Sequence, residues 1–96
     1  MSEIYRRGSD KDNNLTPRSV DTGGLSTTIK PPSGKSQVID PAKLKQLEAI
    51  KDGADHASVR PKEMARMQEW IDSRSSNDTH EFTKELREAI IRTQKK

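Results

Sequence analysis

Large apolar side chains are scarce throughout this chain, and their scarcity limits what it can fold into. Only 28% of its 96 residues are hydrophobic, whereas 34% are charged. Burial of apolar surface is the main favourable contribution to folding, and it must exceed the conformational entropy that the ordered chain loses. We therefore expect a protein that is marginally stable alone and gains stability on the surface of a partner.

The first part of the sequence predicts disorder. Residues 1–37 are rich in serine, threonine, glycine and proline, and Gly23-Gly24 interrupts them further. Their apolar residues stand singly and follow neither the helical nor the strand period. We predict a disordered tail over residues 1–37 and a helical partner-binding region over residues 38–96.

The first predicted helix covers about residues 41–52. Asp40 can cap its start, and Pro41 suits the first helical position. Gly53 is typical of a helix end. The apolar positions recur at three-residue spacing and are Leu44, Leu47 and Ile50.

Two further amphipathic helices are predicted at about residues 60–73 and 79–94. Pro61 suits the first turn of the former, and Asp78 with Glu81 resembles a capping box at the start of the latter. Their apolar faces contain Met64, Met67, Trp70 and Ile71 in one helix and Phe82, Leu86, Ala89 and Ile90 in the other. The expected fold class is mostly α, with about three short helices after the tail.

No residue pattern indicates catalysis, a cofactor or a metal centre. Cysteine is absent, which excludes disulfides and thiolate metal sites. Asp52, Asp55 and His56 lie close in sequence, but a closed metal site needs about four rigidly held ligands, and we favour a solvated loop here. His80 is interpreted as a surface residue. We expect a protein that is not an enzyme.

The charge pattern favours a protein partner over nucleic acid. The net charge is +3, and acidic residues are interleaved with basic ones, which gives no continuous phosphate-binding stripe. An isoelectric point near 9.3 keeps a nucleic-acid-binding accessory protein as an alternative. The start of the chain lacks a secretory signal, and no apolar run is long enough for a membrane span, so we expect a cytoplasmic protein.

Two segments resemble the flagellar anti-sigma factors, the FlgM family. Leu44 to Gly53 reads Leu-Lys-Gln-Leu-Glu-Ala-Ile-Lys-Asp-Gly, which is similar to the first part of the family's C-terminal pattern, and Met64-Ala65 is similar to the second. The resemblance implies binding to a sigma factor, inhibition of its use by RNA polymerase, and export without a cleavable signal through a secretion channel.

The combined prediction is a non-enzymatic regulator or adaptor that docks apolar helix faces into grooves of a protein partner, with a sigma factor as the partner that the resemblance implies. A secreted helical subunit that associates with itself through residues 79–94 is a further alternative. The predicted partner-binding residues are Leu44, Leu47, Ile50, Met64, Met67, Trp70, Ile71, Phe82, Leu86 and Ile90.

Overall fold

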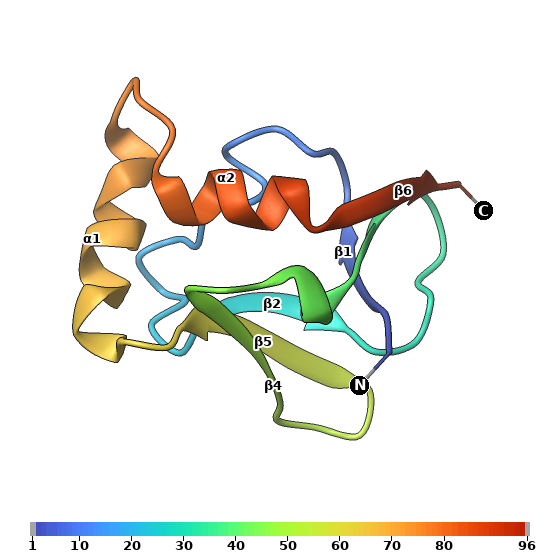
Figure 1. Cartoon of the computed structure of the whole chain (residues 1–96). Coiled ribbons are helices and arrows are strands. Elements are labelled where there is room, and N and C mark those ends of the chain that lie inside the picture. The colour runs from blue at the N-terminus through green and yellow to red at the C-terminus, as the bar shows by residue number, and fades with distance from the viewer. Residues whose placement is uncertain (1, 96) are drawn as a thin grey trace.

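The computed structural model describes residues 2–95 and contains a six-stranded antiparallel sheet in the order β4-β5-β2-β1-β3-β6 (Figure 1). The strands are β1 (Ile4–Arg7), β2 (Leu25–Thr28), β3 (Ser36–Ile39), β4 (Leu47–Lys51), β5 (His56–Pro61) and β6 (Ile90–Gln94). The helices are α1 (Met67–Asp72) and α2 (Glu81–Glu88), with 3₁₀ turns η1 (Pro41–Lys43), η2 (Met64–Arg66) and η3 (Ser73–Ser75). The prediction of a mostly α fold is therefore wrong.

The prediction of a disordered tail over residues 1–37 is also wrong. This segment supplies β1 and β2, the two central strands of the sheet. Its isolated apolar residues Ile4, Leu15 and Leu25 each have an exposed fraction of 0%. A short strand needs only one or two inward-facing apolar side chains, because the ladder satisfies its backbone and alternate residues face away from the core. Single apolar residues are thus sufficient here.

The segment predicted as a helix over residues 41–52 forms only a 3₁₀ turn and a strand. The side chain of Asp40 does accept a hydrogen bond from the Ala42 N–H, but the turn ends at Lys43. Residues Leu47–Lys51 then pair with β5 over five residues. Pairing with a strand that lies beyond Gly53 outweighs the helical spacing, which is a weak preference in a segment this short.

The other two predicted helices are real but much shorter than expected. In the range 60–73, the first residues belong to β5 and a helix forms only over Met67–Asp72. In the range 79–94, α2 ends at Glu88 and the chain continues as β6, which pairs with β3. The β-branched residues Ile90 and Ile91 favour a strand, and the partner strand β3 is distant in sequence.

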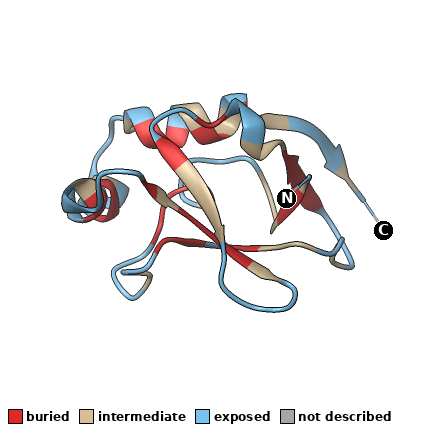
Figure 2. Ribbon diagram, turned by 60° about the horizontal axis from the view of Figure 1, so that its bottom comes forward, coloured by how far each residue is buried: buried red, intermediate tan, exposed pale blue. Residues whose placement is uncertain are grey.

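One core lies between the sheet and the two helices. Figure 1 shows α2 running across the sheet and α1 beside one end of it, and Figure 2 shows buried residues on the helices and on the strands. Trp70 of α1 and Phe82 of α2 meet edge to face, with ring centroids 5.7 Å apart. The buried hydroxyl of Thr83 accepts from Trp70 Nε1 at 3.0 Å and bonds the Thr16 hydroxyl at 2.7 Å. This buried chain ties the first loop to the last helix.

Glu85 fixes the start of β4 against α2. Its carboxylate accepts hydrogen bonds from the backbone N–H groups of Lys45, Gln46 and Leu47, at 3.0, 3.0 and 2.9 Å. These amides precede or begin the strand, where β5 does not yet supply all of their partners. A helix side chain therefore completes the backbone bonding of an edge strand.

Candidate functional site

The sheet opens between its two central strands, and this opening positions the candidate site. β2 pairs with β5 over four residues and β1 pairs with β3 over four, but β1 and β2 share only the pair Tyr5↔Thr28. Next to that pair, the Arg6 side chain bonds the backbone of β2 where backbone hydrogen bonds between β1 and β2 would otherwise be expected. Its Nη1 donates to the Ser26 carbonyl at 2.9 Å.

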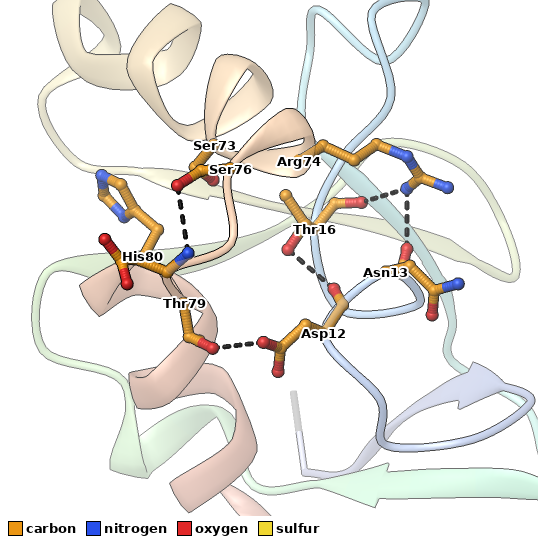
Figure 3. A pocket seen from close by; sticks show the side chains of 9 residues that line it. Asp12, Asn13, Thr16, Ser73, Arg74, Ser76, Thr79 and His80 are labelled. Atoms are coloured by element: carbon orange, nitrogen blue, oxygen red, sulfur yellow. Dashed lines mark hydrogen bonds between the residues drawn. The ribbon is translucent and has the colours of Figure 1, made fainter.

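Two arginines hold the loop between β1 and β2 from both sides. Arg6 Nε donates to the Asn14 carbonyl at 2.8 Å. Arg74, in η3, donates through Nη1 to the carbonyls of Asn13 at 2.7 Å and Thr16 at 2.9 Å (Figure 3). Both guanidinium groups are thereby anchored by neutral oxygen atoms, and neither takes part in a salt bridge within residues 2–95.

These side chains surround an open hollow of about 270 Å³, which we call the arginine site. Arg18 is the third cation there, and its Nε lies 3.5 Å from a carboxylate oxygen of Asp21. Burial lowers the pKa of Arg6, and Asp21 opposes that shift while Arg18 and Arg74 add to it. The arginine site is lined by Arg6, Asn13, Asn14, Arg18 and Arg74.

Arg74 also lines the two hollows beside the arginine site. One of them, of about 120 Å³, separates the first loop from the segment that leads into α2 (Figure 3). There Asp12 accepts hydrogen bonds from Thr79 and Arg87, and these two contacts lower the pKa of the Asp12 carboxyl. Two protein donors bind that carboxylate, so this hollow contains a structural contact, whereas the arginine site keeps an excess of positive charge.

The predicted partner-binding residues lie mainly in the interior. Leu44, Leu47, Met67, Trp70, Ile71, Phe82 and Leu86 are all buried. Ile50 and Ile90 are half-buried, and Met64 is exposed. The structure brings most of them together as core rather than as an outward-facing stripe. Docking of a protein partner, including a sigma factor, stays a prediction, as does self-association.

The three side chains considered as metal ligands, Asp52, Asp55 and His56, form two separate contacts instead. Asp52 bonds His56, whereas Asp55 lies 3.4 Å from the Lys30 ammonium. Within residues 2–95, no group of three histidine or acidic side chains is placed to hold a metal ion. His80 is not a simple surface residue, since its Nδ1 accepts from the Phe82 N–H at 3.0 Å and caps α2.

Sequence reasoning missed the arginine site because its residues have no shared pattern. Arg6, Arg18 and Arg74 are separated by 11 and 55 intervening residues, and each is flanked by ordinary mixed charge. A basic stripe would have been visible as a run, but a site assembled from a strand, a loop and a 3₁₀ turn is not. The opening of the sheet at Arg6 depends on tertiary pairing alone.

Comparisons with protein-family models, curated proteins and solved structures find no match for this chain. Within residues 2–95, the structure contains no helix with the length and apolar character of a membrane span.

Proposed function

We propose that the protein binds a phosphate-bearing ligand through the arginine site. The observation that carries this proposal is the convergence of three guanidinium groups on one hollow. Of these three groups, Arg18 alone forms a salt bridge within residues 2–95, with Asp21. Arginine is suited to phosphate because its planar fork of N–H donors matches two phosphate oxygens at once. An excess of positive charge at a concave surface attracts such an anion.

The anchored arginines keep donors that a ligand can use. Arg6 bonds protein oxygens through Nε and Nη1, and Arg74 does so through Nη1 alone. A guanidinium has five N–H donors, so each group retains N–H bonds, including both of those on Nη2. The carbonyl partners fix the orientation of the two groups without neutralising their charge. Such preorganisation lowers the entropy that a ligand must lose on binding.

Inorganic pyrophosphate is a direct probe of this proposal. Titrated into ¹⁵N-labelled protein, it should shift the backbone amide resonances of Asn13 and Asn14 and the side-chain Nε–H resonances of Arg18 and Arg74. Arg18→Glu changes the local charge by two units and should weaken binding about tenfold, because each exposed charge contributes about 1 kcal/mol or less at contact distance. Affinity should also fall as ionic strength rises.

Lys30→Glu is the matched control, since Lys30 is likewise an exposed cation with one carboxylate neighbour. The proposal fails if both charge reversals weaken binding equally, or if the resonance shifts are spread over the surface. A single-stranded oligonucleotide, tested beside pyrophosphate, distinguishes the source of the phosphate. Tighter binding and a steeper salt dependence for the oligonucleotide would identify a nucleic acid ligand.

A further inference from the structure

A hydrogen-bonded chain of four polar side chains lies on the outward face of β2 and β5. The Ser26 hydroxyl is 2.7 Å from Nε2 of His56, and Nδ1 of His56 bonds the carboxylate of Asp52. The second oxygen of Asp52 accepts from the Ser58 hydroxyl at 2.5 Å. The order is hydroxyl, imidazole, carboxylate, and none of these groups contributes to the arginine site.

The strand register explains why these residues meet. Ser26 stands opposite Ser58, and His56 stands opposite Thr28, so Ser26 and His56 are diagonal neighbours on one face. The alternate residues of both strands face the core instead, and they are Leu25, Thr27, Ala57 and Val59.

The turns at the ends of these strands complete the arrangement. Asp52 follows β4, and its N–H donates to the His56 carbonyl at 3.1 Å, which folds its side chain back onto the imidazole. Gly24 precedes β2 with φ of +127°, and a Cβ there would lie 2.8 Å from the Val59 carbonyl oxygen. Only glycine allows β2 to begin this close to β5, two residues before Ser26.

The hydrogen bonds define which atoms carry protons. Bonds from His56 and Ser58 lower the pKa of Asp52, so its carboxyl is ionised at neutral pH and can only accept. Nδ1 of His56 must therefore carry its proton, and in the neutral imidazole Nε2 offers a lone pair. In that neutral form, the Ser26 hydroxyl is the donor to Nε2. This is the proton arrangement of a serine beside a general base.

We propose that Ser26 is a nucleophile in ester hydrolysis, with His56 as its general base and Asp52 as the positioning residue that orients His56. Ser26 Oγ bonds the ester carbonyl carbon as its proton passes to His56 Nε2. The C–O bond to the alcohol breaks, and the departing oxygen takes that proton. Water then attacks the acyl group on Ser26, gives a proton to His56, and releases the carboxylic acid as the proton returns to Ser26 Oγ.

The surroundings of Ser26 determine the class of ester. Ser26 is exposed, and the side chains of Asp52 and His56 are about two-fifths exposed. Ser26, His56 and Asp52 line none of five well-defined hollows within residues 2–95, so a small or protruding ester with little demand for apolar contact fits them. Arg6 donates to the backbone carbonyl of Ser26, which holds the strand that carries the nucleophile.

A neutral fluorophosphonate tests the nucleophile without any need for the natural ester. The serine oxygen displaces fluoride from phosphorus, and intact-mass measurement with peptide mapping locates the adduct. We expect a single adduct, on Ser26, and none in Ser26→Ala. His56→Gln and Asp52→Asn should each slow labelling by about 10²-fold or more, because they remove the base or its orientation. Circular dichroism must show that both variants remain folded.

Ser33→Ala is the matched control, because Ser33 is an exposed serine in the loop between β2 and β3, and it should label at the rate of the unaltered protein. The proposal is overturned if the folded protein takes up no adduct, if several serines react equally, or if folded His56→Gln labels at the original rate. Those outcomes would mean that the four side chains only stabilise the turn between β4 and β5 and its contact with β2. Arg18→Glu should label normally, so this test is independent of phosphate binding.

Discussion

Two charged clusters on this protein differ in whether acidic side chains neutralise their arginines. Arg66 lies 3.0 Å from the Glu69 carboxylate and 2.6 Å from that of Glu81, and Nε2 of His80 lies 2.6 Å from Glu69. We call these four residues the Arg66 cluster. In the arginine site, by contrast, two of three guanidinium groups bond only neutral carbonyls within residues 2–95.

The difference indicates which cluster maintains the fold and which can receive a ligand. The Arg66 guanidinium lies 4.5 Å from the centre of the Phe82 ring, so the Arg66 cluster covers the edge of the core. Its positive and negative groups satisfy one another and leave little net field. The arginine site has the same kind of side chain but keeps surplus positive charge, which the anion that we propose would balance.

The largest expected effect on stability comes from removing the Glu85 carboxylate, which accepts hydrogen bonds from the protein backbone. Glu85→Ala removes the acceptor of three backbone N–H groups at the start of β4. The free energy of unfolding should fall by about 2–3 kcal/mol, because hydrogen bonds to a charged group contribute about 1.5–3 kcal/mol and water replaces part of this loss. Urea denaturation measures the change, and Glu88→Ala on the exposed side of α2 is the control. Equal losses in both variants would contradict this role of Glu85.

The next effect is ligand-dependent and separates the two clusters directly. Pyrophosphate at ten times its dissociation constant should raise the free energy of unfolding by about 1.4 kcal/mol, since it binds only the folded state. Thermal unfolding should show this shift in the unaltered protein and in Glu81→Gln, a change in the Arg66 cluster. It should be much smaller in Arg18→Glu at the same pyrophosphate concentration. A full shift in Arg18→Glu would place the bound anion elsewhere.

Acid should weaken the Arg66 cluster by protonating Glu69. Hydrogen bonds from Arg66 and His80 hold the pKa of Glu69 at about 2, below its ordinary value. A carboxyl with a depressed folded pKa contributes stability above its unfolded pKa and loses it as pH falls through the folded one. The unaltered protein should therefore lose more stability than Glu69→Gln between about pH 4.5 and pH 2. Parallel urea midpoints of the two proteins over that range would exclude the effect.

The smallest effect should come from neutralising one unmatched charge without ligand. Arg18→Gln removes the repulsion between Arg18 and Arg6 but also loses the exposed pair with Asp21. The net change should be a slight gain, below about 0.5 kcal/mol, that disappears in high salt. Denaturation at two ionic strengths checks this. A clear loss of stability at low salt would show that Arg18 is structural.

Local sequence patterns predicted part of the helical structure, but they did not predict which segments pair as strands in the tertiary structure. His80 and the residues after it do begin a helix, and Phe82 and Leu86 do share its buried face. The same helical spacing at Leu44 and Leu47 predicted a helix where a strand pairs with β5. Three or four apolar residues cannot distinguish these outcomes, because non-local pairing decides between them.

The two candidate sites were still harder to predict. Asp52 and His56 were recognised as neighbours, but Ser26 joins them only through the register of β2 with β5. The chain between Ser26 and His56 contains β3, η1 and β4 and the loops that join them. No short sequence motif therefore indicates that Ser26 and His56 are in contact. Likewise, Arg6 and Arg74 meet through the loop that both of them bind.

The arrangement of the sheet has a consequence for how the molecule is made. β1 lies beside β3, β3 lies beside β6, and Glu3 near the start forms an ion pair with Arg92 near the end. During synthesis, the first strand leaves the ribosome long before the strand that completes its side of the sheet. The complete sheet must therefore await almost the whole polypeptide, and such distant pairing slows folding. Truncation of β6 should consequently expose the edge of β3 and remove the ion pair of Arg92 with Glu3.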